Sequence, residues 1–121
     1  MELIRKGDFK ILSNPGVESA QIINPDNSTS ERLTITRVLV QPGSEQGRHT
    51  HESSEQIWIA LKGTGTLLLA DGQTEQFSEG DVARFADQTV HGLLNESDTV
   101  FEYLSVTSPP INFRNAYKKE R

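Results

Sequence analysis

The chain has 121 residues, of which 12 are Lys or Arg and 17 are Asp or Glu, so its formal net charge is −5 and its pI is about 5.1. This length suits one domain with its own core, and the acidic balance argues against nucleic-acid and anionic-membrane partners, because both require a basic face. The sequence contains no cysteine, which excludes disulfides, thiolate metal sites and a cysteine nucleophile. No window is apolar enough for a membrane span, and the first residues do not resemble a signal peptide, so we expect a cytoplasmic protein.

In chain order, residues 1–31 contain the turn-forming runs SNPG and NPDNSTS, and we expect an irregular lead-in with one edge strand at most. Short apolar and β-branched runs then predict strands near 32–40, 56–62, 65–70, 74–77, 81–85, 90–94 and 100–106. Between two of these runs, Asp71 and Gly72 predict a two-residue hairpin turn, since both central residues of that turn need positive φ. Residues 109–121, which begin with Pro109 and Pro110, are expected to leave the sheet and to fray or pack on the outside. Even strand spacing with glycine-rich turns favours a β-sandwich or a small barrel.

The chain has three histidines, and two of them stand one residue apart. On an extended strand side chains alternate, so His49 and His51 point to the same face and are placed to bind one ion. An isolated H-x-H pair is a weak signal, because most such pairs lie on the surface or form ordinary hydrogen bonds. Its surroundings strengthen it: five residues separate Gly43 from His49, and a second glycine-framed run, GDVARFADQTVHGLLN, carries His91.

These spacings resemble the cupin superfamily, whose two motifs are G(X)5HXH(X)3–4E(X)6G and G(X)5PXG(X)2H(X)3N. The positions that agree are Gly43, His49, His51, Gly63, Gly80, His91 and Asn95. The chain departs from the second motif at Ala86, where the family has proline, and at Gln88, where it has glycine. The resemblance covers about residues 33–108. It implies an all-β jelly-roll barrel, or double-stranded β-helix, as a single domain over 1–121, with one divalent metal ion held by His49, His51 and His91.

The fourth ligand of such a site lies at Glu55 or Gln56. Counting forward from His51 permits either residue, whereas the motif's requirement of six residues between the ligand and the closing Gly63 selects Gln56. Strand alternation adds that an inward Gln56 brings Trp58 inward with it and turns three aliphatic residues to the other face. We favour Gln56, with Trp58 as an aromatic shelf for substrate.

A neutral amide beside three imidazoles leaves the charge of the ion undiminished, which favours a divalent Lewis acid; spacing does not choose among Fe, Ni, Zn, Mn and Cu. The first hypothesis is therefore an isomerase, lyase or tautomerase acting on a small oxygenated metabolite, such as a sugar derivative or a keto acid. A dioxygenase of quercetinase type would be favoured if Glu55 were the ligand. The third hypothesis is a barrel that binds a metal or another ligand without catalysis.

Further site residues are predicted around this centre. Glu55 is the candidate general base, and Arg37 is a candidate to reach into the barrel and hold an anionic substrate. Phe85 and Tyr103 are expected to line the cavity with Trp58. We also expect a homodimer, because small cupins generally pair and unpaired sheet edges need covering.

Overall fold

The computed structural model describes residues 1–120. It consists of eleven strands and three short 3-10 helices within this range: η1 (Lys6–Asp8), β1 (Lys10–Asn14), β2 (Val17–Ile23), β3 (Thr34–Val40), β4 (Glu45–His49), β5 (Glu55–Lys62), β6 (Thr64–Leu68), η2 (Ala70–Gly72), β7 (Thr74–Ser78), β8 (Val82–Phe85), β9 (His91–Leu94), β10 (Phe101–Ser108), η3 (Phe113–Ala116) and β11 (Lys119–Glu120). Among these residues no helix has the length and apolar character that crossing a membrane requires.

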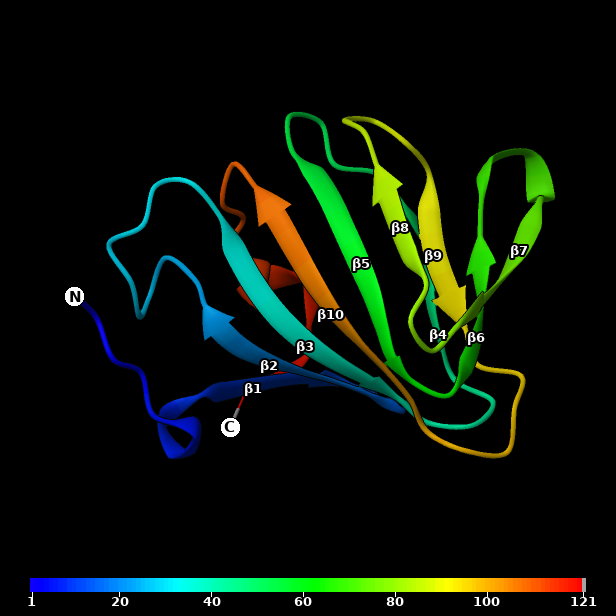
Figure 1. The fold of residues 1–121 in the computed structure, drawn as a ribbon, viewed down its shortest axis with the longest axis horizontal. Coiled ribbons are helices and arrows are strands. Elements are labelled where there is room, and N and C mark those ends of the chain that lie inside the picture. Colours follow the sequence, from blue (N-terminus) through cyan, green and yellow to red (C-terminus); the bar gives the residue numbers. More distant parts are fainter. Residues whose placement is uncertain (121) are drawn as a thin grey trace.

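The strands form two antiparallel sheets that face each other and open as a V (Figure 1). The larger sheet has the order β11-β1-β2-β3-β10-β5-β8, and the smaller has the order β4-β9-β6-β7. Strands distant in sequence are neighbours in space, since β10 lies between β3 and β5 and β9 lies between β4 and β6. This arrangement is the double-stranded β-helix, so the predicted fold class is confirmed.

Each of the seven predicted runs overlaps an observed strand. The positive φ predicted for the turn is found at Asp71, with φ 58°, and at Gly72, with φ 72°. The connection is longer than the predicted two residues, because residues 69–73, which include η2, join the paired strands β6 and β7. Gly63, which closes the first motif, has φ 87°, and a Cβ atom there would lie 2.9 Å from the carbonyl oxygen of Val100. A side chain at this position would be both strained and in collision with backbone.

The expectation of an irregular N-terminal lead-in is wrong. Residues 10–23 form a hairpin of β1 and β2, joined by Pro15 and Gly16, which has φ 76°. The alternation of β2 is masked in the sequence because its buried side chains include Ser19 and Gln21 as well as Val17. A strand whose inner face is polar lacks the apolar period of two on which strand prediction relies.

The expectation that the C-terminal tail packs outside is also wrong over residues 109–120. Lys119 and Glu120 pair with β1 as the two-residue strand β11. Before them, η3 and Tyr117 line the cavity described below, and Asn14 donates a hydrogen bond to the carbonyl oxygen of Ala116 at 3.1 Å. The two-residue strand is too short and too charged to be recognised locally, and Arg121 lies outside the described residues.

The core lies between the two sheets, where the inward side chains of both meet. Its buried hydrophobic residues are Val17, Val38, Val40, Trp58, Ala60, Leu67, Phe77, Phe85, Leu93, Phe101 and Tyr103. β5 begins and β10 ends at the open end of the V (Figure 1). Buried side chains near these strand ends, and on β3 beside them, are polar instead, among them Thr36, Gln56, Ser105 and Thr107. The barrel therefore has a packed apolar end and an open polar end, and the candidate metal centre lies at the polar end.

Candidate metal centre and its cavity

The three histidines meet at the open end of the barrel. His49 ends β4 and His91 begins β9, and these two residues are direct partners across the smaller sheet. His51 follows β4 by two residues. One ring nitrogen of each histidine lies within 4.8 Å of the corresponding nitrogens of the other two. The backbone therefore brings together all three imidazoles that the sequence singled out.

Backbone carbonyl groups set the orientation of two of these rings. Nδ1 of His49 lies 2.9 Å from the carbonyl oxygen of Gly47, and Nδ1 of His91 lies 2.8 Å from that of Thr89. A carbonyl oxygen only accepts, so both Nδ1 atoms carry the proton and each neutral ring presents the lone pair of Nε2. A hydrogen bond to the non-ligating nitrogen is the usual support of a metal-binding histidine.

The loop before β9 is tied to the loop after β4. The backbone N–H of Gln88 donates to the carbonyl oxygen of His51 at 2.7 Å. Gln88 has φ 66°, a left-handed conformation, at the position where the second motif has glycine. The departure from the motif thus preserves the turn, because Gln88 adopts the backbone conformation that glycine adopts without strain.

The buried position of the imidazoles keeps two of them neutral. Burial lowers the pKa of His91 to about 4, although its hydrogen bond to Thr89 acts in the opposite direction. Burial also lowers the pKa of His51, and the neighbouring His49 lowers it further. Nε2 of His51 is buried and has no hydrogen-bond partner among residues 1–120. A contact with Gln56 acts on the pKa of His51 in the opposite direction. A buried ring nitrogen without a hydrogen-bond partner, close to the nitrogens of two other histidines, matches the requirements of a cation.

Gln56 completes this cluster with its amide oxygen. Trp58 can only donate through Nε1, and that atom lies 3.2 Å from Oε1 of Gln56, while Nε2 of Gln56 donates to Oγ1 of Thr107 at 2.8 Å. Oε1 therefore faces Nε2 of His91, at 2.9 Å. Both of these atoms are acceptors when His91 is neutral, so no hydrogen is available between them. A cation between the two lone pairs would resolve this contact.

Glu55 lies on the opposite face of β5. Its carboxylate accepts a hydrogen bond from Nε of Arg84 at 2.8 Å, and both side chains are well exposed. Arg37 is exposed on the outer face of β3, between the buried Thr36 and Val38. The structure brings neither Glu55 nor Arg37 to the cavity, because strand alternation turns both outward. The roles expected for them, general base and anion holder, are therefore contradicted by their positions.

The aromatic residues divide between the wall of the cavity and the support of a ligand. Trp58 and Tyr103 line the cavity, with ring centroids 4.5 Å apart. Phe85 is buried but lies behind the site, where it stacks on His91 at 4.5 Å with an interplanar angle of 10°. Phe85 thus holds a histidine ring in place. The expectation that it lines the cavity is wrong.

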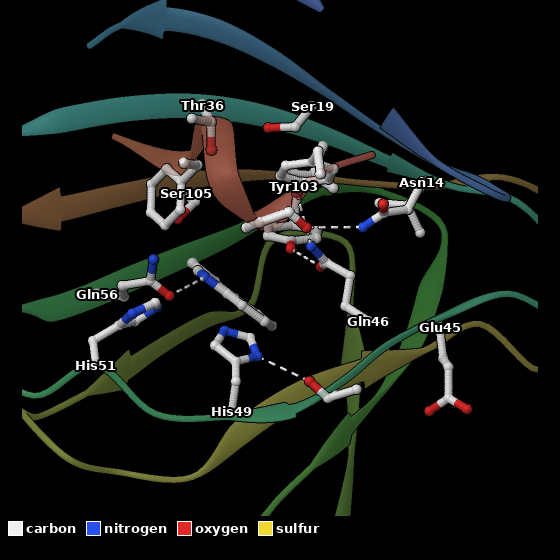
Figure 2. Close-up of a pocket in the computed structure, with 17 residues that line it drawn as sticks. Asn14, Ser19, Thr36, Glu45, Gln46, His49, His51, Gln56, Tyr103 and Ser105 are labelled. Atoms are coloured by element: carbon white, nitrogen blue, oxygen red, sulfur yellow. Dashed lines mark hydrogen bonds between the residues drawn. The ribbon is translucent and has the colours of Figure 1, made fainter. Parts of the chain in front are cut away.

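The cavity has a volume of about 300 Å³ and opens beside the histidines (Figure 2). Sequence reasoning missed most of its lining: Asn14, Val17, Ser19, Thr36, Val38, Glu45, Gln46, Gly47, Ser105, Phe113, Ala116 and Tyr117. These residues come from both sheets and from the C-terminal segment. The available signal was the alternation of these buried residues with partly buried or exposed neighbours on β2, β3 and β10, but the segment after residue 108 carries no such pattern.

A second polar group lies in the cavity away from the histidines. The hydroxyl of Tyr103 donates to Oε1 of Gln46, and Nε2 of Gln46 lies 3.1 Å from the hydroxyl of Tyr117. Burial raises the pKa of both tyrosines, so both phenols stay protonated at neutral pH. Figure 2 shows Gln46 and Tyr103 on the far side of His49 from His51.

A double-stranded β-helix with a histidine triad at its open end, two from one strand region and one from a later strand, defines a cupin barrel. The model of the cupin domain matches residues 36–107, more than half of the chain, and the chain belongs to this family. Its three histidines are placed to hold one metal ion.

Similar proteins carry several different names. The oxalate-binding protein of Thermotoga maritima is 28% identical over 90 residues, which are 74% of each chain. Among solved structures, KdgF from Halomonas sp. has a TM-score of 0.78 at 18% identity and covers 93% of this chain and 96% of its own. The polyketide cyclase RemF from Streptomyces resistomycificus has a TM-score of 0.77 at 21% identity, over 89% of this chain and 79% of its own. At these identities the structures show the shared fold.

Proposed function

We propose that the protein is a metal-dependent enzyme of the Lewis-acid type, an isomerase, lyase or tautomerase acting on a small oxygenated metabolite. One observation carries the proposal: Nε2 of His91 and Oε1 of Gln56 face each other at 2.9 Å as two acceptors, beside the unpartnered Nε2 of His51. The proposed ligands of one divalent ion are His49, His51, Gln56 and His91. Imidazole-rich sites suit Fe, Ni, Zn, Mn and Cu.

When bound, such an ion polarises a substrate oxygen and stabilises the negative charge that develops on it. The amide of Gln56 supports this chemistry because it brings no charge of its own, so the positive charge of the site remains undiminished. Trp58 and Thr107 hold that amide with its oxygen towards the histidines. The aromatic wall of Trp58 and Tyr103 excludes water on one side and offers a face to the substrate.

The position of Glu55 bears on the alternative of a dioxygenase. That hypothesis would be favoured if Glu55 were a metal ligand, and Glu55 is paired with Arg84 on the outer surface. The phenols of Tyr103 and Tyr117 line the cavity and stay protonated, because burial raises the pKa of both, so neither serves as a base that removes a proton from substrate. The structure thus favours chemistry in which polarisation of the substrate dominates.

The test is elemental analysis of protein purified without a histidine tag, for the wild type, His91→Ala, Gln56→Glu and Glu55→Gln. Glu55→Gln is the matched control, because it changes the adjacent residue on the opposite face. We expect near-stoichiometric divalent metal in the wild type and the control and loss of metal in His91→Ala. Gln56→Glu should keep the metal but lose turnover in a screen of sugars and keto acids. A wild type that takes up no metal, or turns over nothing with any of the five metals, would overturn the proposal.

A second candidate is a barrel that binds its ligand without catalysis. It is favoured by the name of the Thermotoga maritima relative, an oxalate-binding protein, and by the outward position of the only predicted base. Saturable binding of oxalate to the metal-loaded protein, without turnover in the screen above, would select this candidate. Turnover of any screened compound would exclude it.

We also infer that the protein is a homodimer. The outer face of β5 is apolar, with Ile57, Ile59 and Leu61 turned away from the core, and Val82 on the edge strand β8 is 63% exposed. An exposed apolar face beside an unpaired edge strand is typical of an interface. Light scattering at micromolar concentration should give twice the monomer mass for the wild type and the monomer mass for Val82→Glu. A monomeric wild type would contradict the inference.

A further inference from the structure

Two hydroxyl groups that face the cavity make no hydrogen bond to the described part of the protein. Thr36 on β3 and Ser105 on β10 are 3% and 4% exposed, line the cavity, and stand directly opposite each other in the register of the two strands. Within residues 1–120 neither side chain has a hydrogen-bond partner, and neither oxygen is sealed from the cavity. The neighbouring buried threonines differ: Thr34 is bonded to Ile111, and Thr107 accepts from Gln56. Two adjacent hydroxyls that no described protein group engages and that open into a cavity are available to hydrogen-bond an oxygen atom of a ligand.

The pair lies across the cavity from the histidines. Figure 2 shows Thr36 and Ser105 on the opposite side from His49 and His51. Ser105 precedes Thr107 by two residues, and Thr107 is the strand partner of Gln56. Two residues of strand span about 7 Å. The hydroxyl pair therefore lies about 7 Å along the strands from Gln56, which is the length of a six-membered ring with its substituents. A molecule of that length would contact the histidine cluster at one end and the hydroxyls of Thr36 and Ser105 at the other.

The charge of the cavity restricts what the far end of that molecule carries. Among the described residues that line the cavity none is Lys or Arg, and Glu45 is the one carboxylate, which Figure 2 shows directed away from the histidines. Arg37, the neighbour of Thr36, is turned to the outer face. A carboxylate or phosphate beside Thr36 would therefore be desolvated without a cationic partner. The far end of the molecule must be uncharged.

The walls between the two ends are aromatic. Trp58 is the direct strand partner of Ser105, and Phe113 of η3 lines the cavity and contacts the ring of His51 at 5.9 Å between centroids. Tyr103 lies against Trp58. Such faces favour a flat ring over an extended chain.

We propose that Thr36 and Ser105 form a specificity-determining subsite for an uncharged oxygen, a ketone or hydroxyl, at the far end of a flat, ring-sized substrate whose other end carries the oxygens that bind at the metal centre. The proposal rests on the proposed metal centre and adds the class of substrate. It excludes dicarboxylates and phosphorylated sugars as ligands that fill the whole cavity.

The test compares three probes of one shape on zinc-loaded protein by calorimetric titration. 3,4-Dihydroxyacetophenone has a neutral carbonyl at the far end, 3,4-dihydroxybenzoate has a carboxylate there, and 4-methylcatechol has no oxygen there. The proteins are the wild type, the double variant Thr36→Val with Ser105→Ala, the conservative variant Thr36→Ser, and Thr34→Val. Thr34→Val is the matched control, because it makes the same change two residues earlier on the same face of β3, outside the cavity. Zinc content is measured on every sample.

The wild type should bind the ketone about 3- to 10-fold more tightly than 4-methylcatechol, as one or two neutral hydrogen bonds give, and should bind the carboxylate more weakly than the ketone. The double variant should lose the advantage of the ketone while its affinity for 4-methylcatechol and its zinc content stay unchanged. Thr36→Ser and Thr34→Val should keep that advantage. A carboxylate that binds best, a ketone advantage that survives in the double variant, or no binding of any probe to zinc-loaded protein would overturn the proposal. Absence of zinc from the wild type would instead count against the metal centre itself.

Discussion

Replacement of Thr107 by valine tests how the amide of Gln56 is held. Thr107 is fully buried, and its hydroxyl accepts a hydrogen bond from Nε2 of Gln56 at 2.8 Å. Valine keeps the shape of threonine but leaves a buried N–H without an acceptor, which costs about 1–3 kcal/mol of the free energy of unfolding. The amide is then free to rotate, and loss of such a supporting contact weakens metal binding by about 10- to 100-fold.

The control for this variant is Thr34→Val. Thr34 is the strand partner of Thr107, is equally buried, and bonds to the backbone of Ile111 rather than to a site residue. Thermal unfolding of the metal-free proteins should show similar losses of stability for both variants. Competition with a chromogenic chelator should show weakened zinc binding for Thr107→Val alone. Zinc affinities that are equal in the wild type and both variants would refute the reasoning that Thr107 orients a metal ligand.

Three further outcomes are expected. The metal-free protein should lose stability as the pH falls from about 6.5 towards 4, because the pKa of His91 is lowered in the folded state and the unfolded chain therefore binds a proton at this histidine first. The urea midpoint should be constant above about pH 7, and His91→Asn should make the urea midpoint depend less on pH between 6.5 and 4. Trp58 is the only tryptophan, and its ring lies 5.4 Å from that of His91, so Ni²⁺ should quench its fluorescence in the wild type but not in His91→Ala; equal quenching in both would place the ion elsewhere. Gly63→Ala should lower the free energy of unfolding by about 2 kcal/mol or more, given its positive φ and the approach of Val100, and an unchanged urea midpoint would contradict this account.

Much of the metal centre could be predicted from local patterns. The spacing of His49 and His51, and the distance of His91 from its preceding glycine, indicated a cupin before any tertiary contact was known. The choice of Gln56 over Glu55 as the inward residue followed from strand alternation and from the count to Gly63, and the structure confirms that orientation. These features are local, because a period of two and a fixed turn geometry depend only on neighbouring residues.

Other parts of the site were decided by contacts between distant segments. Arg37 stands one residue from Thr36, so alternation places the two on opposite faces, but only the register of β3 with β10 shows that Thr36 meets Ser105. Tyr117 enters the cavity because the C-terminal segment returns to pair with β1, a contact across more than one hundred residues that no local period encodes. The sequence by itself therefore determined the fold class and the three histidines, whereas the tertiary structure decided the far wall of the cavity. The reason is physical: alternation assigns a side chain to a face, but strand register and chain return decide what that face meets.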